Sequence, residues 1–570
     1  MATSREFRVL CTRGFRRRGW SRPWLLKLIE ASALRLVSKA PMSAGISAAA
    51  RLMRTARQSG YGRQGPKGGG GGGPSWNFLA GTVAAFVGLA VYLPPTPKPA
   101  IKRGYNEEDD DDDKCYKTDV LVIGGGIVGS AVACYITKAG VRNVTLLERG
   151  TLGCEASGLS AGTIWNAGEP SPVRAEDAAL FLRARSATLL EELGGCEFNR
   201  CGALDVAATA AEAKLLRADF EQQRRQGLAV EWLGDQDAIV ALEPALAGGS
   251  ALCATHTPLS GSVQPALATQ RFAAIAAANG CAIIENAEVT SIRKSGAESR
   301  AHKQAYEAKT SDGRTFAAKH LVIAAGATAA PLASGLGAHL HVEVAPVKGV
   351  VCTSTAHAQP GALRKVIYDM GSRLHFSKSG SGRDDAGGVP AKCTHDGDGS
   401  RRCRKLYGKQ CGASDNHMIL FGGDRLPGAA ATDHEVPAAS STSIRANVRE
   451  LLPFLRGFDD EDEEAAGEWA GLMPFSQDGR PIVGSLGHLG MKTCWLAIGF
   501  GPSGIMEGPY AAKLLAARIA VYFGARLLPS IDAADKVILA SFDPNPSKRG
   551  EEMSDRKAQG SLKKWSLGNR

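Results

Sequence analysis

The sequence has little of what disulfide frameworks and metal centres require. Its 13 cysteines are an odd number, and no two of them form a CxxC pair. An odd count without paired spacing argues against a complete disulfide framework. Cys393, Cys403 and Cys411 share one polar stretch, but their spacing matches no zinc pattern. We therefore interpret the cysteines as buried or free thiols in a reducing compartment and predict no metal site.

Acidic residues are nearly absent from the N-terminal part of the chain. Residues 1–103 hold 18 Lys and Arg but only two acids, Glu6 and Glu30, and so carry +16, whereas the remainder holds 50 against 55 and carries −5. Because the formal net charge of +11 belongs to the leader, we expect no nucleic-acid partner for the folded part. The Arg-, Ser- and Ala-rich residues 1–66 are typical of an organellar transit peptide, with the mitochondrion as the first expectation and the plastid as the alternative.

Charged residues are also missing from residues 76–93, which follow a glycine-rich hinge. Trp76 and Tyr92 stand near the two ends of this segment, where amphipathic rings prefer the headgroup zone of a membrane. About 18 residues at roughly 1.5 Å each come close to the lower limit for spanning a hydrocarbon core. The pattern predicts a single membrane anchor, with an inserted hairpin or a cleaved sorting signal as alternatives. Residues 67–117 then comprise the hinge, the anchor and an acidic linker.

The first segment with a chemical meaning is a β-α-β pattern. An apolar run, Val120–Ile123, is followed by a helix-compatible segment over 127–139 and a second apolar run, Val144–Leu147, which ends at Glu148. A carboxylate at the tip of the second strand accepts hydrogen bonds from a ribose diol and repels a 2′-phosphate. The pattern therefore favours FAD or NAD over NADP.

Three glycines, Gly124-x-Gly126-x-x-Gly129, join the first run to the helix. In such a fingerprint Gly124 makes the tight turn, Gly126 lets the backbone approach a pyrophosphate, and Gly129 lets the helix and strand pack closely. The free N–H groups of the helix N-terminus then face the phosphates. The segment as a whole predicts a dinucleotide site.

Periodicity outlines the rest of the body. Helical patterns cover 175–194 and 210–226, and a third begins at Pro265. Ser311-Asp312-Gly313 predicts a hairpin turn. Short alternating runs from 338 to 433 predict an antiparallel sheet whose last strand ends at Gly422-Gly423.

Several motifs in the same order resemble one known family. After Glu148 comes Ser157-x-x-Ser160-x-Gly162, an apolar strand later ends at Gly326, and Trp469 opens the stretch WAGLMPFSQDGRPIVG. These resemble the FAD-dependent amine and amino-acid oxidoreductase family that includes D-amino-acid oxidase, glycine oxidase and sarcosine oxidase. The resemblance covers roughly residues 118–524.

The resemblance implies a mixed α/β fold, in which a Rossmann-like FAD-binding domain is interleaved with an α+β substrate domain built on an antiparallel sheet. The FAD-binding parts fall at about 118–175, 260–335 and 468–524, the substrate parts at about 176–259 and 336–467, and a polar tail at 525–570. Cofactor contacts are expected from Gly124, Gly126, Ile127, Val128, Gly129, Glu148, Arg149, Ser157, Ser160, Gly162, Val289, Gly326, Gly501, Ser503, Gly504 and Ile505.

The chain departs from the family pattern at Met473. Glycine oxidase-like members carry an arginine there that clamps the substrate carboxylate, and methionine cannot do this. Arg373, Lys348 or Arg480 are alternative sources of charge, and Tyr368 and His375 are, with Met473, candidates to line the substrate pocket.

Family members attach the flavin covalently through a histidine after the fingerprint or a cysteine near 466–484. This chain has no histidine before His256 and no cysteine in 466–484, which favours non-covalent FAD.

The resemblance implies oxidation of the C–N bond of an amine, or of an N-methyl or D-amino acid, by hydride transfer to the flavin, with oxygen, quinone or an electron-transfer protein as the acceptor. Many such sites need no strong base, so we assign no catalytic residue. Two alternatives stay open. One is an FAD-dependent dehydrogenase of a 2-hydroxy acid or polyol phosphate that reduces quinone, and the other is a non-catalytic assembly factor that retains FAD.

Overall fold

The computed structural model describes residues 115–171, 177–295, 305–338, 340–354, 360–369, 406–415, 417–455, 467–525 and 531–549. The predicted leader, the membrane segment 76–93, the acidic linker, Arg373 and His375 lie outside these ranges. Within them, no helix combines the length and the apolar character needed to cross a membrane.

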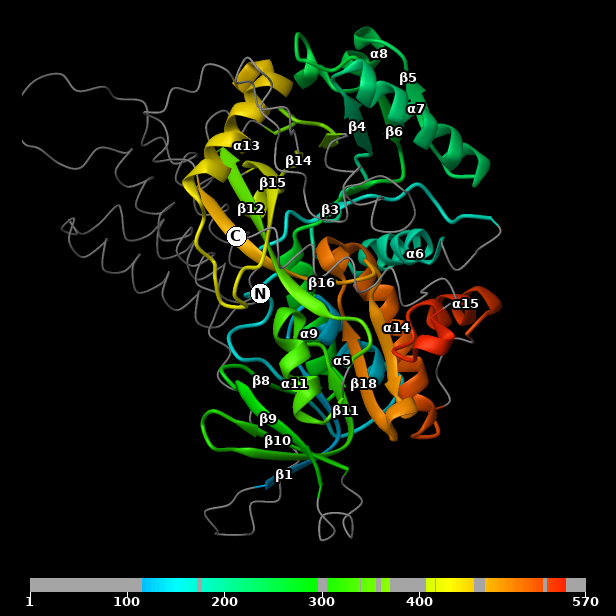
Figure 1. The fold of residues 1–570 in the computed structure, drawn as a ribbon, viewed down its shortest axis with the longest axis vertical. Helices are drawn as coiled ribbons and strands as arrows, with labels where there is room; N and C mark the ends of the chain where they lie inside the picture. Colours follow the sequence, from blue (N-terminus) through cyan, green and yellow to red (C-terminus); the bar gives the residue numbers. More distant parts are fainter. Residues whose placement is uncertain are drawn as a thin grey trace, which may run out of the picture. The chain divides into compact units, whose positions relative to one another are not determined.

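The first of two large sheets is organised around a parallel core (Figure 1). Strand β1 pairs in parallel with β11 and β2, β2 with β8, and β11 with β18, while β17 pairs antiparallel with β18. The hairpin of β9 and β10 joins β11. The bounds are β1 Cys115–Ile123, β2 Val144–Leu147, β8 Ala282–Ile284, β9 Val289–Lys294, β10 Tyr306–Thr310, β11 Thr315–Ile323, β17 Ile482–Leu486 and β18 Met491–Ile498.

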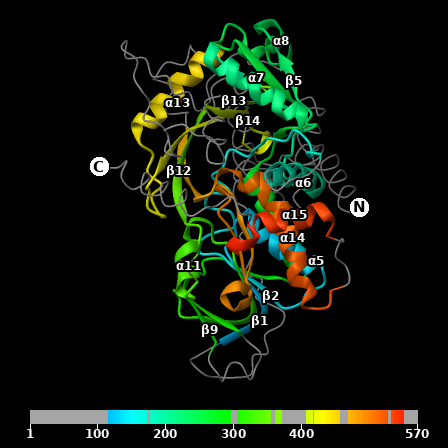
Figure 2. The same ribbon diagram turned by 45° about the vertical axis from the view of Figure 1, so that its right-hand side comes forward.

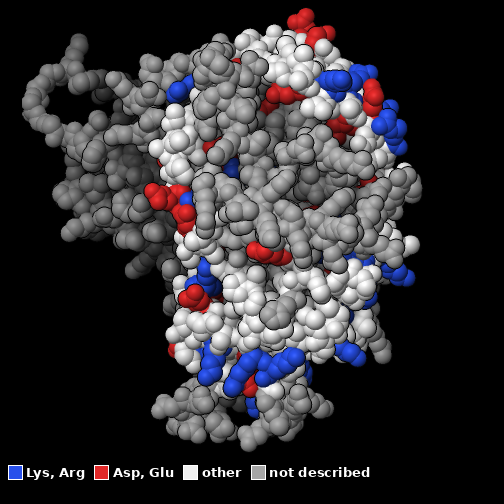
Figure 3. All heavy atoms as spheres, in the orientation of Figure 1, with Lys and Arg blue, Asp and Glu red and all other residues white. Residues whose placement is uncertain are grey.

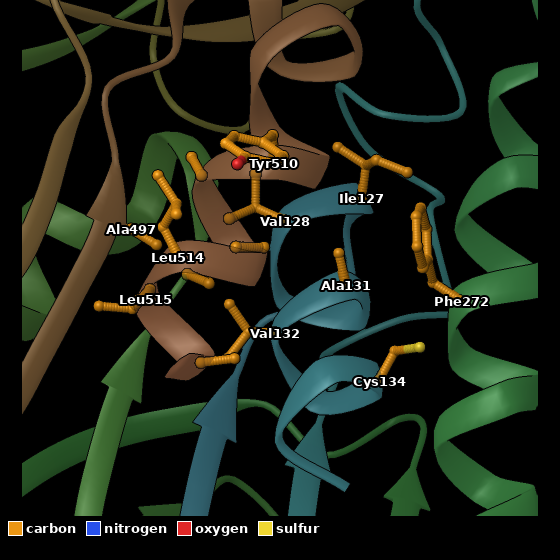
Figure 4. Close-up of a cluster of buried hydrophobic side chains, with 14 of the residues drawn as sticks. Ile127, Val128, Ala131, Val132, Cys134, Phe272, Ala497, Tyr510, Leu514 and Leu515 are labelled. Atoms are coloured by element: carbon orange, nitrogen blue, oxygen red, sulfur yellow. The ribbon is translucent and has the colours of Figure 1, made fainter. Parts of the chain in front are cut away.

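Helices α5 (Ile127–Lys138), α9 (Pro265–Ala278) and α14 (Gly504–Val521) cover one face of this sheet. Figure 4 shows Val128 and Val132 of α5 pointing toward Leu514 of α14. Burying each such side chain contributes about 1.5–3 kcal/mol. Helix α14 comes close to α5 because its Gly508 has no side chain: an added Cβ would lie 2.8 Å from Val128 Cγ2.

The opposite face of the same sheet packs on the β9–β10 hairpin and on α11 (Ala329–Gly335). Both faces are therefore covered, which explains why the parallel strands read as continuous apolar runs rather than as alternating ones. In Figure 3, Lys and Arg side chains gather at the lower end of the described body, over β9 and β10. Acids balance part of this charge, since Arg293 pairs with Glu307 and Lys319 with Asp119.

The second sheet has the order β16-β12-β15-β14-β13-β4-β6-β5, and all of its pairs are antiparallel except β13 with β4. Helix α13 contacts β12 and β15, whereas α7 and α8 lie over the β4–β6 end (Figures 1 and 2). The bounds are β4 Ala203–Ala207, β5 Glu231–Leu233, β6 Cys253–Thr257, β12 Val344–Ser354, β13 Val366–Asp369, β14 Tyr407–Gln410, β15 Ile419–Pro427, β16 Glu468–Ser476, α7 Ala210–Arg225, α8 Gln236–Leu242 and α13 Ala438–Leu451.

The remaining elements lie beside these layers. They are β3 Thr163–Ile164, which pairs with β7 Gly261–Ser262, then α6 Ala178–Leu193 and α15 Ala533–Ser541. The predicted mixed α/β architecture is confirmed. The last strand before α13 differs from expectation, because β15 continues through Gly422-Gly423 to Pro427.

The described part of the predicted polar tail contains a helix. Helix α15 starts with a capping box between Asp532 and Asp535, and the Phe542 side chain is 2% exposed. Arg549 donates to both carboxylate oxygens of Asp478, at 2.7 and 2.9 Å. Ile538, Leu539 and Phe542 of this polar stretch are buried in the same hydrophobic cluster as α5 and α14, which docks the segment on the body of the protein.

Candidate functional site

A cavity of about 750 Å³ opens at the carboxyl ends of β1 and β11. Ligands of open parallel sheets bind at this edge. Residues of the first sheet, such as Ile123, and of the second sheet, such as Gly349 and Tyr407, line the same cavity. The site is therefore assembled from both sheets.

Most residues predicted to contact the cofactor meet in this cavity. Those that line it are Gly124, Gly126, Ile127, Val128, Glu148, Arg149, Ser157, Ser160, Gly162, Val289, Gly326, Gly501, Ser503, Gly504 and Ile505. Gly129 lies behind the wall, in the contact between β1 and α5. Of the predicted pocket residues, Tyr368 and Met473 line the cavity and His375 is not described.

The turn between β1 and α5 leaves no room for side chains. Gly124 has φ of +108°, and a Cβ on it would lie 2.5 Å from the carbonyl oxygen of Ala324. A Cβ on Gly129 would lie only 1.9 Å from the carbonyl oxygen of Gly124. The two glycines thus set the close approach of strand and helix at the cavity wall.

The N-terminus of α5 faces the cavity without a side-chain cap from Gly126. The Ile127 N–H donates to Ser157 Oγ at 2.9 Å, which fixes the serine loop against the helix. Partial positive charge and open N–H groups at such an end suit a diphosphate.

Glu148 is held at the tip of β2 with 7% of its surface exposed. One carboxylate oxygen accepts from the Gly125 N–H at 2.6 Å and the other from the Gly150 N–H at 2.8 Å. Each oxygen retains a lone pair for a ribose hydroxyl. Arg149 pairs with Glu155, which also lies 3.2 Å from His434 Nε2.

The serine loop offers a polar atom that the protein leaves unpaired. Ser160 Oγ is buried at the cavity wall and has no hydrogen-bond partner among the described residues. Gly162 has φ of +66°, and a Cβ on it would lie 2.2 Å from the Val263 carbonyl oxygen, which accepts from Lys409 Nζ at 2.7 Å. Burial lowers the pKa of Lys409. The glycine turn, open helix end, carboxylate and unpaired hydroxyl together fit FAD.

The start of α14 forms another part of the wall, and sequence reasoning missed the residue that holds it. Arg183 of α6 donates from Nε to Glu507 at 2.9 Å and from Nη2 to Ser503 Oγ at 3.3 Å. Burial raises the pKa of Glu507, while the Arg183 guanidinium opposes the rise. This contact positions Gly504 and Ile505 at the cavity.

On the side of the second sheet, aromatic side chains line the cavity. Tyr368 of β13 and Tyr407 of β14 are neighbours across the sheet, and burial raises the pKa of both phenols. Both phenols therefore stay neutral at physiological pH, and a neutral phenol can donate as well as accept a hydrogen bond. Tyr407 was missed because it fits over Gly422, where an added Cβ would lie 2.0 Å from the ring.

Two of the residues considered as sources of charge in place of an arginine at position 473 lie outside the cavity lining. Lys348 pairs with Asp433 at 2.6 Å and Arg480 lies 3.4 Å from Asp478, and neither lines the cavity. Arg425 of β15 does line it. Reading Gly422-Gly423 as the end of the strand had placed Arg425 in a loop.

Comparison with known proteins agrees with this geometry. The chain matches the family model DAO, described as FAD dependent oxidoreductase, over residues 119–518, which is more than half of its length. It is 28% identical to glycine oxidase of Geobacillus kaustophilus over 409 residues, covering 70% of this chain and 92% of that protein. It is also 31% identical to 4-methylaminobutanoate oxidase (formaldehyde-forming) of Paenarthrobacter nicotinovorans, over 31% of this chain and 21% of that protein.

Among solved structures, glycine oxidase from Geobacillus kaustophilus superposes with a TM-score of 0.57 at 25% identity, covering 76% of this chain and 99% of that one. The predicted cofactor, FAD, is confirmed by the family match together with the fit of the cavity. The chain belongs to the DAO family of FAD-dependent oxidoreductases.

Proposed function

We propose that this protein oxidises the C–N bond of an amine or of an amino acid, including N-methyl and D-amino acids. The observation that carries the proposal is a single cavity that joins a dinucleotide-binding wall to a wall of Tyr368, Tyr407, Arg425 and Met473. The likeness to glycine oxidase over most of both chains supports the same substrate class.

The residues of the chain serve chiefly to position the substrate and to keep water away from it. Bound FAD supplies the acceptor for a hydride from the carbon next to the substrate nitrogen. Tyr368, Tyr407 and Trp165 line the cavity with rings, which excludes water from the reacting carbon. The carboxylates among the described lining residues are Glu148, Glu155 and Glu288, all on the dinucleotide side, so we assign no general base.

Anaerobic spectroscopy of the full-length holoenzyme tests the proposal. We expect flavin absorbance that bleaches with one or more of sarcosine, glycine, D-amino acids and polyamines. Well-folded protein without flavin absorbance bands would contradict the assignment of FAD as the cofactor. Bleaching only with 2-hydroxy acids or polyol phosphates would replace the amine reaction with the hydroxy-acid alternative, and bleaching with no compound would leave the assembly-factor alternative.

We further propose that the protein is anchored in an organellar membrane, most simply that of the mitochondrion, through residues 76–93. An uncharged 18-residue stretch after a basic, acid-poor leader supports this location. A membrane setting would suit quinone or an electron-transfer protein as the electron acceptor, with oxygen as the alternative.

A further inference from the structure

We propose that Arg425 binds a carboxylate of the substrate, so that the enzyme takes amino acids in preference to simple amines. This inference rests on the proposed function and narrows it. It assigns to β15 the anion-binding role that Met473 of β16 cannot perform.

The register of the second sheet places Arg425 on the face that lines the cavity. Gly349 of β12 lies directly opposite Arg425 of β15 on one side and Gly471 of β16 on the other. Directly opposed residues share a face of a sheet, and so do residues two apart along a strand. Arg425, Gly349, Gly471 and Met473 therefore share one face, and all four line the cavity.

Gly349 has no side chain, so the Met473 side chain has room to lie across β12. The Met473 side chain lies over this glycine, where an added Cβ would meet its Cε at 2.7 Å. Arg425 also extends toward β16, because its Cζ lies 5.9 Å from the centroid of the Phe475 ring. The Arg425 side chain thus points from β15 toward β16, the strand that contains Met473.

The cationic residues that line the described part of the cavity come from three different elements. Arg149 follows β2, Arg183 belongs to α6 and Arg425 belongs to β15. Arg425 is the one on the second sheet. Burial lowers its pKa to about 10, so the guanidinium stays charged at neutral pH.

A guanidinium in such surroundings favours a planar anion. Its rigid fork matches both oxygens of a carboxylate, and the surrounding rings weaken the competition from water. Tyr407 lies close enough for the charge of Arg425 to act on its pKa, which places a neutral hydrogen-bonding group beside the same anion site. A polyamine, by contrast, would bring a second positive charge toward Arg425.

Binding of an inert carboxylate to the full-length holoenzyme tests the inference without turnover. Benzoate should perturb the flavin spectrum, whereas benzamide, its neutral isostere, should do so far more weakly. Arg425→Met should weaken benzoate binding by roughly 30-fold or more, the scale expected when the partner of a desolvated charge is lost. Arg425→Lys should retain part of the affinity, since it keeps the charge but loses the fork.

Two further variants make the result specific. The double variant R425M/M473R should regain most of the benzoate affinity, because position 473 overlies Gly349 on the same face. The control Arg445→Met removes a guanidinium that pairs with Glu468 outside the cavity and should leave benzoate affinity unchanged. Flavin absorbance and the unfolding midpoint verify that each variant is folded.

The outcomes separate the two proposals. Flavin that bleaches with an amine substrate, together with benzoate affinity that is the same in wild type and Arg425→Met, would overturn the role of Arg425 and keep the proposed function. Equal binding of benzoate and benzamide by the wild type would also overturn it. Wild-type protein without flavin would overturn both.

Discussion

At the scale of single residues, Gly129 sets the distance between β1 and α5. A methyl group at this position would lie 1.9 Å from the Gly124 carbonyl oxygen, so helix and strand would have to separate. We expect Gly129→Ala to destabilise the fold by about 1–3 kcal/mol, the usual range for overpacking, and to lower the flavin content of the purified protein. The measurements are denaturant unfolding and the ratio of flavin to protein absorbance.

Gly335→Ala is the matched control for this substitution. Gly335 ends α11, and its nearest neighbour for an added Cβ is the Ile292 carbonyl oxygen at an ordinary 3.7 Å. Full flavin content and wild-type stability in Gly129→Ala would contradict the packing role of the third glycine.

Single residues also mark the limit of what the sequence revealed. Gly124, Gly126, Gly129 and Glu148 were found because their spacing within one short segment reflects contacts within that segment. Arg425 was not found, because its position depends on Gly349, a partner in another strand. No local pattern in the sequence records such a pair.

At the scale of elements, His320 joins β11 to β18 and to the end of α14. Its ring is 5% exposed, accepts from Trp495 Nε1 at 3.3 Å, and packs against Tyr522 and Phe523. Burial lowers its pKa to about 4. Between pH 6.5 and 4 the unfolded chain therefore binds a proton that the folded protein excludes, and the stability present above pH 6.5 declines as the pH falls.

We expect the lowered pKa of His320 to reduce the free energy of unfolding by about 1 kcal/mol as the pH falls from 8 to 5.5. His320→Gln should be less stable than wild type at pH 8, and the gap should shrink at pH 5.5. Denaturant unfolding of both proteins at the two pH values measures this difference in stability. A gap that stays constant would show that His320 titrates normally in the folded state.

The sequence predicted most elements of the first sheet and fewer of the second. The β1–α5–β2 unit, α9 and α14 follow from local periodicity and glycine turns, and the helices expected at 175–194 and 210–226 match α6 and α7. The parallel pairing of β13 with β4 was not predicted, because it joins distant segments. The continuation of β15 through two glycines depends on the Tyr407 ring, which fills the space above Gly422.

At the scale of the whole molecule, the proposed anchor predicts where the protein is found. Full-length protein expressed in eukaryotic cells should remain with organellar membranes after an alkaline wash. Deletion of residues 76–93 should release it into the soluble fraction while leaving the flavin spectrum intact, since the described cavity draws on no residue before Ile123. Recovery of the full-length chain in the wash supernatant would refute the anchor.

The cofactor site combines a glycine turn that is synthesised early with elements that are synthesised much later. Strand β18, the start of α14 and the Arg549 side chain that reaches back to Asp478 are all synthesised late, yet β18 pairs with β11 beside the first glycine turn. A nascent chain thus lacks one wall of its cavity until β18 and the start of α14 have been synthesised. For a protein imported as we propose, the flavin must be loaded after translocation, from the supply of the destination compartment.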